Sequence, residues 1–269
     1  MQAHDQTHEQ HARLQENLRH INKTIVIMSG KGGVGKSTVA ANLAIALAKK
    51  DHTVGLMDAD IHGPNIPKML GIDGVKFMSD SQGIQPVAYS SKLTIASVAF
   101  FLDSTDEAVI WRGPLKHSLI RQFVGDVQWG KLDYLVIDLP PGTGDEPLSV
   151  AHTIPSISGA IIVTTPQDVA LLDARKSVTF ARKLNMPIGG ILENMSRFCC
   201  PHCGESIDIF QHGGGERTAN ELNVPFLGRI PLDPLLVQKG DAGKPYVDAY
   251  PASEITAAFL NLAEQCEQW

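Results

Sequence analysis

A glycine-rich stretch with two lysines, Gly30–Thr38, is the part of this chain whose residue types most clearly carry chemistry. It reads Gly-Lys-Gly-Gly-Val-Gly-Lys-Ser-Thr, follows an apolar run and precedes a run of helical composition. Glycines let the backbone curl until several N–H groups point inward, and the N-terminus of the following helix adds its positive dipole end. A phosphate-binding loop needs this strand–loop–helix context. The stretch therefore predicts that the chain binds a nucleoside triphosphate.

Within this loop, the residue types predict separate roles. We expect Lys36 to reach the β- and γ-phosphates, and the Ser37 hydroxyl to bind Mg²⁺. The backbone of the whole loop is predicted to cradle the nucleotide, through Gly30, Lys31, Gly32, Gly33, Val34, Gly35, Lys36, Ser37 and Thr38.

Acidic residues follow two further apolar runs. Asp58 and Asp60 lie one residue apart at the end of a strand-like run, where they can serve Mg²⁺, the attacking water or both. Asp138 ends another such run and matches the second acid on the magnesium side of P-loop enzymes. The segment after it is rich in proline and glycine, which suits a loop that changes shape with the γ-phosphate.

Lys31 is a second lysine that an ordinary phosphate loop does not require. In one interpretation it is a solvated surface charge. In the other it reaches the nucleotide of a second subunit and neutralises charge in the transition state, as an arginine finger does. The second interpretation predicts a homodimer in which hydrolysis depends on the pairing of two chains.

Cys200 and Cys203 form a Cys-x-x-Cys turn that aims two sulfurs at one point. Such a pair suits zinc, an iron–sulfur cluster or a redox disulfide. A complete zinc or cluster site needs about four ligands, and the sequence has no second Cys-x-x-Cys. Cys199 is adjacent to the pair rather than correctly spaced, so we do not expect it to be a ligand.

Three alternatives for the cysteine pair stay open. His202 and His212 would complete a zinc site within one chain. Two copies of the chain, related by a two-fold axis, would instead contribute four thiolates to one shared metal centre. The pair could also be a disulfide or chemically inert. The shared centre is favoured, because it uses the dimer that Lys31 already suggests.

Apolar runs alternate with helical stretches along the chain, and this pattern predicts a doubly wound α/β fold with a mostly parallel sheet covered on both faces. We expect one P-loop NTPase domain, residues 23–269, after a polar leader, residues 1–22, that is a short surface helix or a disordered tail. A small hairpin is expected within 71–85. Strands are expected near 24–29, 53–58, 93–99, 132–138, 159–164, 187–193 and 225–230, and helices near 36–50, 114–127, 146–153, 168–185, 215–223, 233–240 and 252–267.

Charge and composition narrow the classes of partner. The formal net charge of -6 argues against broad affinity for nucleic acid or anionic lipid. No apolar run approaches the roughly 18 residues that span a bilayer. Four cysteines in 269 residues do not make a disulfide framework, so we expect a reducing, cytoplasmic setting.

The phosphate loop with its first lysine resembles the deviant Walker A loop of the MinD/ParA/nitrogenase-iron-protein superfamily. Members of that superfamily form ATP-sandwich dimers through the first lysine. The resemblance implies ATP rather than GTP and suggests Asp60 as the residue that handles the attacking water. It also places Asn194 at the strand end where the superfamily recognises adenine.

Over about residues 23–266 the chain looks like the Mrp/ApbC group of P-loop ATPases, the iron–sulfur cluster carrier proteins. This resemblance implies a slow ATP hydrolase that forms a homodimer. Cys200 and Cys203 of both chains would bridge one 4Fe–4S cluster, which is then donated to apo-proteins, and zinc could occupy the site in aerobic preparations. The similarity rests on Met57–Pro67, Trp111–Pro114, Asp138–Asp145, Thr165–Ala170 and Cys200–Cys203.

The main rival interpretation is a MinD/ParA-like ATPase switch with a structural zinc site. A membrane switch of that class uses a basic amphipathic C-terminal helix, whereas Glu254–Glu267 is acidic on its polar side and suits packing on the sheet. The acidic net charge disfavours DNA partitioning. In an electron donor like the nitrogenase iron protein the ligand cysteines lie far apart in sequence, unlike this close pair.

Overall fold

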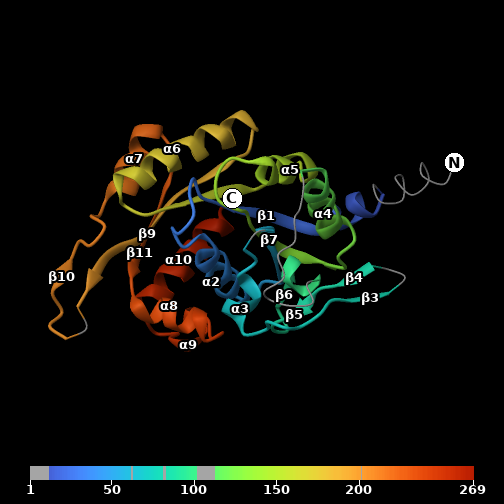
Figure 1. Cartoon of the computed structure of the whole chain (residues 1–269), viewed down its shortest axis with the longest axis horizontal. Helices are drawn as coiled ribbons and strands as arrows, with labels where there is room; N and C mark the ends of the chain where they lie inside the picture. Colours follow the sequence, from blue (N-terminus) through green and yellow to red (C-terminus); the bar gives the residue numbers. More distant parts are fainter. Residues whose placement is uncertain (1–11, 62, 81–82, 102–112, 201) are drawn as a thin grey trace.

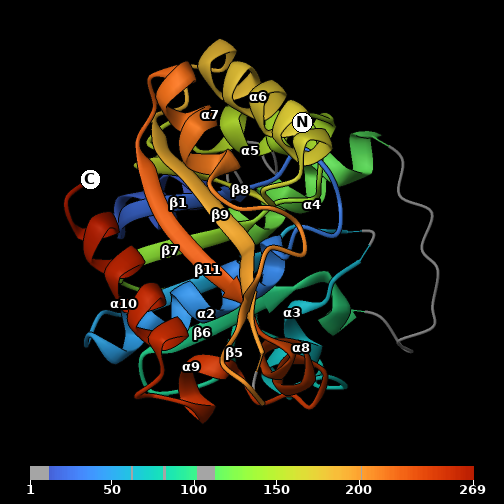
Figure 2. The same cartoon turned by 90° about the vertical axis from the view of Figure 1, so that its left-hand side faces the viewer.

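A mostly parallel sheet with helices on both faces forms the body of the molecule (Figure 1; Figure 2). The computed structural model describes all residues except 1–11, 62, 81–82, 102–112 and 201. Within that part of the chain, nine strands join one sheet in the order β10-β9-β8-β1-β7-β2-β6-β5, with β11 paired to β9. The predicted α/β architecture is therefore confirmed.

Each predicted strand and helix is found in the expected order and type, with small shifts at its ends except in β9, which is six residues longer than expected at its C-terminal end. The strands are β1 (Ile21–Met28), β2 (Val54–Asp58), β3 (Met78–Asp80), β4 (Gly83–Gln85), β5 (Val87–Ala88), β6 (Leu93–Ser97), β7 (Leu132–Asp138), β8 (Gly159–Thr164), β9 (Ile188–Cys199), β10 (Ser206–Ile207) and β11 (Phe226–Leu232). The α-helices are α2 (Lys36–Lys49), α3 (Ile66–Leu70), α4 (Gly113–Gly125), α5 (Asp145–Thr153), α6 (Asp168–Lys183), α7 (Gly214–Leu222), α8 (Pro234–Asp241), α9 (Tyr246–Ala249) and α10 (Glu254–Glu267). The pair β3–β4 is the expected hairpin, whereas α3, α9, β5 and β10 had no counterpart in the sequence pattern.

Alternate residues of the central strands face two separate helix layers. Ile25 and Ile27 of β1 belong to the apolar core shared with α2 and α10, whereas Val26 and Met28 belong to the core shared with α4, α5 and α6. A strand buried on both faces reads as a continuous apolar run, which is why these strands were recognisable. Helix α10 buries Phe259 completely and packs against α2 and β11, as its sequence predicted.

The parallel pairing brings the carboxyl ends of the central strands to one edge of the sheet. In the register of β2 and β7, Asp58 lies beside Asp138. Strand β1 lies next to β7 and leads directly into the phosphate loop at the same edge. Ligands of open α/β sheets bind at this edge.

Strand β9 is longer than expected and extends beyond the end of its neighbour β8. Its neighbour β8 ends at Thr164, opposite Glu193, but β9 continues to Cys199 with only β11 and β10 as partners. Met195 and Arg197 have φ angles of 55° and 53°, and β11 is bulged alongside them. Residues 195–212, which we call the cysteine arm, form the projection at the left of Figure 1.

The second half of the predicted leader belongs to the folded domain. Residues 12–19 are helical, in line with one of the two expected alternatives, and Leu14 is buried. The Asn17 amide donates to the carbonyl oxygens of Val124, Gly125 and Val127 at 2.8–3.0 Å, which satisfies the end of α4. Strand β1 begins at Ile21, before the expected boundary. Residues 1–11 of the leader, and Trp111 and Arg112 of one recognised motif, lie outside the described residues.

Candidate nucleotide and metal site

The phosphate loop connects β1 to α2, and its glycines are required by geometry. Gly33 and Gly35 have φ angles of 81° and 82°, in the left-handed region that glycine adopts without strain. A Cβ atom on Gly30 would lie 2.3 Å from the backbone of Asp173 in α6. A Cβ atom on Gly35 would lie 2.2 Å from the amide nitrogen of Asn194. The loop is therefore held in its curled shape by contacts with two other elements.

A cavity of about 210 Å³ lies over the loop. The structure brings four of the predicted site residues, Lys31, Lys36, Ser37 and Asp60, to its wall. The rest of the wall is formed by the loop residues Gly32, Gly33, Val34, Gly35 and Thr38 together with Ser29, Asn65, Met69 and Pro141. Phosphate would meet backbone N–H groups, a helix N-terminus and two lysines in this space.

Lys36 and Asp138 form a buried ion pair beneath the cavity. The Lys36 Nζ atom lies 2.6 Å from Asp138 Oδ1, and both side chains are almost completely removed from solvent. Lys36 Nζ also lies 3.4 Å from the Ser37 hydroxyl. Burial raises the pKa of Asp138, while the positive charge of Lys36 acts in the opposite direction. The predicted phosphate-binding lysine and the predicted magnesium-side acid are thus in direct contact.

Asp138 has a free oxygen that fits a metal ion. Its Oδ2 atom is buried and has no hydrogen-bond partner among the described residues. A buried, unsatisfied carboxylate oxygen is costly unless a ligand completes it. The Ser37 hydroxyl lies 3.4 Å from Lys36 Nζ, which itself contacts Asp138. Ser37 and Asp138 would therefore hold Mg²⁺, which supplies positive charge to the β- and γ-phosphate oxygens.

Asp58 and Asp60 have different environments. Asp58 is fully buried and accepts hydrogen bonds from the Ser97 hydroxyl at 2.9 Å and from the backbone N–H groups of Asp60 and Ile66. Burial, together with the nearby charge of Asp138, raises the pKa of Asp58 to about 8. Asp58 therefore shapes the turn after β2, and Asp60 is the member of the pair that lines the cavity.

Asn194 contacts the phosphate loop itself. Its buried amide group donates a hydrogen bond of 2.8 Å to the carbonyl oxygen of Val34. The sequence placed Asn194 just beyond a strand, but it lies within β9, because that strand runs on to Cys199. Contact of Asn194 with adenine stays a prediction.

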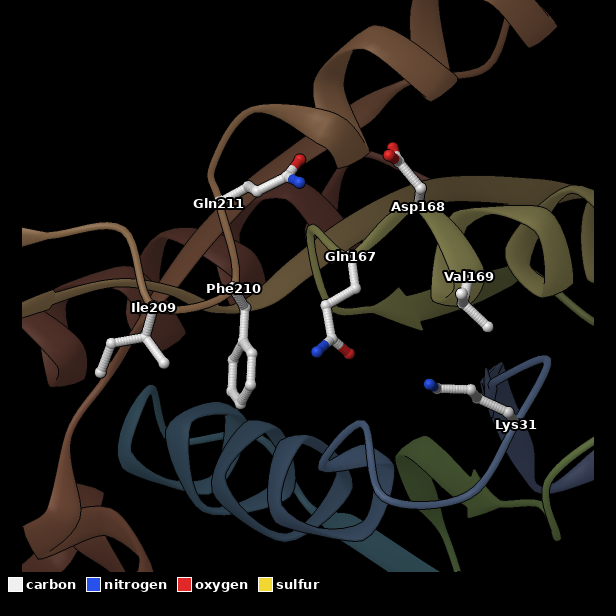
Figure 3. A pocket seen from close by; sticks show the side chains of 7 residues that line it. All are labelled: Lys31, Gln167, Asp168, Val169, Ile209, Phe210 and Gln211. Carbon is white, nitrogen blue, oxygen red and sulfur yellow. The ribbon is translucent and has the colours of Figure 1, made fainter.

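Lys31 lies between two cavities. Besides the phosphate cavity it lines a second one, of about 480 Å³, which Figure 3 shows from close by. In that view the Lys31 side chain extends into the cavity in the direction of Gln167. The wall is completed by the start of α6 and by the return segment of the cysteine arm, and consists of Lys31, Gln167, Asp168, Val169, Ile209, Phe210 and Gln211.

The predicted cysteine ligands lie at the far end of the arm. Cys203 is exposed and Cys200 is half-buried, whereas Cys266 is buried in the core. The turn is closed by a hydrogen bond from the Gly204 N–H to the Cys200 carbonyl, at 2.9 Å. Hydrogen bonds from the backbone of Cys203 and His202, and from the Cys203 thiol, lower the pKa of Cys200. A lowered pKa favours the thiolate, which is the form that binds metal.

The histidines of the intrachain zinc alternative are not assembled with the cysteines. His212 Nδ1 lies 3.1 Å from Asp208 Oδ2, and its Nε2 lies 3.1 Å from an Arg197 nitrogen. In the described part of the chain, no three His, Cys, Asp or Glu side chains are grouped as a metal site. Among the described residues of one copy, the predicted ligands Cys200 and Cys203 therefore have no third metal-binding side chain beside them.

Glu193 is a connecting residue that sequence reasoning missed. Its carboxylate is fully buried on β9 and accepts hydrogen bonds from the N–H groups of Gly213 and Gly215 at 3.0 and 2.6 Å, and from the Ser196 hydroxyl at 2.6 Å. Arg229 Nε lies 3.5 Å away. The available signal was the glycine triplet at 213–215, because a Cβ atom on Gly215 would lie 3.0 Å from Glu193 Cβ.

This sheet, with a phosphate loop at its carboxyl edge and a lysine at each end of that loop, defines a P-loop nucleoside triphosphatase of the ParA type. The chain belongs to the family described as "ParA: NUBPL iron-transfer P-loop NTPase", whose model matches residues 20–267. The recognised family and the predicted fold are therefore both confirmed.

Curated relatives are similar over almost their whole length. An "Iron-sulfur cluster carrier protein" of Methanocaldococcus jannaschii is 51% identical over 96% of this chain and 90% of its own. The "Cytosolic Fe-S cluster assembly factor NUBP2" of Homo sapiens is 46% identical over 93% of both chains.

Solved structures share the fold. One is a nucleotide-binding protein from Archaeoglobus fulgidus, which was solved in complex with ADP and contains cobalt. It has a TM-score of 0.76 and 40% identity over 87% of this chain and 91% of its own. The cell division ATPase MinD of Pyrococcus furiosus has a TM-score of 0.66 and 26% identity over 92% of this chain and 99% of its own.

In the described part of this chain, no helix has both the length and the apolar character needed to cross a membrane.

Proposed function

We propose that this chain is an ATP-dependent carrier that holds a 4Fe–4S cluster between two copies of itself and passes it to apo-proteins. Cys200 and Cys203 of each copy supply the four thiolates. The names of the curated relatives, and the family's description as iron-transfer NTPases, support this function. The human relative is named as cytosolic, which supports a cytoplasmic setting.

One observation carries the proposal: the cysteine pair is accessible and incomplete. Cys200 and Cys203 stand at the tip of the cysteine arm, and no third metal-binding side chain of the described residues joins them. Iron–sulfur clusters are held by Cys thiolates, commonly four, so each copy offers half a ligand set. A pairing of two such turns completes the site without any new residue.

ATP is the nucleotide that we assign to the phosphate loop. The similar Archaeoglobus fulgidus structure contains ADP, which supports an adenine nucleotide. In the proposed cycle Lys36 binds the β- and γ-phosphates, Ser37 and Asp138 hold Mg²⁺, and Asp60 orients the attacking water. Lys31 of one copy acts on the nucleotide of the other. Hydrolysis is slow and coupled to binding or transfer of the cluster.

Anaerobic reconstitution with iron and sulfide tests this function. We expect the wild-type chain to gain about four irons per dimer and to activate an apo-enzyme that requires a 4Fe–4S cluster. Cys200→Ser should still bind ATP but lose the iron and the transfer. Cys199→Ser is the matched control, because it removes the neighbouring thiol without touching the proposed pair, and it should behave as wild type.

Two results would contradict the proposal. Equal iron and sulfide content in Cys200→Ser and wild type would remove the ligand assignment. One zinc ion bound per chain by a monomer, with no transfer of a cluster, would favour the rival ATPase switch with a structural zinc site.

A further inference from the structure

We propose that Glu193 is a positioning residue that links the phosphate loop to the cysteine arm, so that nucleotide binding changes the accessibility of Cys200 and Cys203. This inference rests on the proposed function for its biological meaning. Its physical basis does not depend on that function. Two adjacent residues of β9 contact different parts of the molecule: Asn194 contacts the phosphate loop, and Glu193 contacts the end of the cysteine arm.

The first link joins β9 to the phosphate loop. The Asn194 amide donates to the Val34 carbonyl at 2.8 Å, in a buried contact that leaves no room for a side chain at Gly35. Val34 and Gly35 also form part of the wall of the phosphate cavity. A change in the backbone of this loop on phosphate binding therefore acts directly on β9.

The second link joins β9 to the end of the cysteine arm. Successive side chains of a strand point to opposite faces, so Glu193 faces away from the phosphate loop. Its carboxylate accepts the N–H groups of Gly213 and Gly215, where the arm returns to the body and α7 begins. A carboxylate at a helix N-terminus is favourable, and this one is fully buried. The return end of the arm is thereby fixed to the residue next to Asn194.

The cysteine arm borders a cavity and contains two residues with unusual backbone angles, and both features allow it to move when the phosphate loop changes. Between Asn194 and the cysteines, Met195 and Arg197 adopt left-handed conformations that are unfavourable for residues other than glycine. On the return side, Ile209, Phe210 and Gln211 border the cavity of about 480 Å³ that faces Lys31 (Figure 3). Both strands of the arm thus connect the nucleotide site with the cysteine turn.

Alkylation of the cysteines by iodoacetamide tests the link without any cluster. The measurement uses metal-free chain that carries Cys199→Ser. Because Cys266 is buried, the measured alkylation is then that of Cys200 and Cys203. We expect a non-hydrolysable Mg–ATP analogue to change the alkylation rate by about fivefold or more, within the usual range of coupling between sites. In Glu193→Gln, the amide NH₂ faces backbone N–H donors, so the ratio of rates with and without the analogue should fall toward one. Affinity for the analogue should stay within about threefold of wild type, because Glu193 does not touch the phosphate cavity.

Glu221→Gln is the matched control. It removes the negative charge that pairs with Arg175 at the other end of α7, and it should keep the wild-type ratio. If nucleotide protects the cysteines only by pairing two copies, Glu193→Gln will also keep the wild-type ratio, which overturns the proposal. An unchanged alkylation rate in the wild type overturns it as well.

Hydrogen exchange on the wild type keeps the proposal testable if Glu193→Gln does not fold. We expect the analogue to change exchange in the peptide that covers residues 206–215, and no change there would refute the link. The two proposals fail separately. A chain that shows the nucleotide-dependent alkylation but binds no cluster refutes the carrier function alone, and a cluster-binding chain without that dependence refutes the role of Glu193 alone.

Discussion

The Lys36 ammonium lies 2.6 Å from the Asp138 carboxylate, and both side chains are almost completely buried. Removing one member of such a pair leaves a buried charge without a partner, which typically costs about 3–5 kcal/mol. In the proposed cycle, the phosphates of ATP would compete with Asp138 for the same ammonium group. The ion pair would then hold Lys36 in place in the nucleotide-free loop.

The first prediction follows from this pair. In urea unfolding without nucleotide, Lys36→Met should lower the free energy of unfolding by about 3 kcal/mol or more. The double variant Lys36→Met/Asp138→Asn should recover part of that loss, because no charge is left unpaired. Both variants should lose ATP turnover. A Lys36→Met chain as stable as wild type would show that the ion pair does not contribute.

The second prediction concerns the action of Lys31 across a dimer. Lys31→Ala should retain ATP binding but lose hydrolysis by on the order of a thousandfold, as in other cases where a charge is supplied from a partner. Asp60→Ala should also be inactive, because it lacks the residue that orients water. Mixing the two inactive chains should restore part of the activity, since one site of the mixed dimer has both residues. Activity that stays absent on mixing would place Lys31 in its own site.

The third prediction concerns pH and Asp58. Its pKa is about 8 in the folded chain and near 3.9 when unfolded, so the folded state binds the extra proton between these values. The contribution of Asp58 to stability is complete below the unfolded pKa and is lost as the pH rises through 8. Between these two pKa values, the ionisation of Asp58 lowers the free energy of unfolding by at most about 1.4 kcal/mol for each unit of increasing pH.

Asp58→Asn should remove this slope. Thermal unfolding of the nucleotide-free chain from pH 5 to pH 8 should show the midpoint of wild type falling more steeply than that of the variant. The raised pKa of Asp138 contributes in both proteins, so the difference between them reports on Asp58. Parallel pH profiles would mean that Asp58 is ionised in the folded chain.

The fourth prediction concerns the glycines of the phosphate loop. Gly35→Ala should destabilise the chain by about 1–2 kcal/mol from its left-handed backbone alone, with a further cost from the contact with Asn194. Gly32→Ala is the matched control, because the nearest atom to its added Cβ lies 3.9 Å away. Asn194→Ala should relieve the contact but not the backbone cost, so the double variant should be intermediate. Equal unfolding midpoints for the two alanine variants would contradict this account.

Much of the fold could be predicted because its signals are local. A strand covered on both faces gives a continuous apolar run, and the phosphate loop has its own spacing of glycine and lysine. The end of β9 had no such signal. It passes through two left-handed residues, Met195 and Arg197, and depends on pairing with β11, which lies far along the chain. Long-range pairing and unusual backbone angles cannot be read from periodicity.

The candidate site likewise contains residues that the sequence predicted and one residue that only the fold reveals. Lys31, Lys36, Ser37 and Asp60 were identified from residue type and spacing, and the structure places them on one cavity. Glu193 was missed, because a carboxylate within an apolar run has no apparent partner until the fold brings the glycine triplet to it. The sharing of the cysteines by two copies stays a prediction.

The extension of β9 beyond β8 has a consequence for where the two activities of the chain lie. The cysteine arm contributes little to the core, because Ile207 and Ile209 are about half exposed and Cys203 is exposed. Shortening or replacing the arm would leave the nucleotide-binding body intact. In the proposed carrier, metal binding therefore depends on a peripheral segment, whereas nucleotide binding depends on the sheet and the phosphate loop.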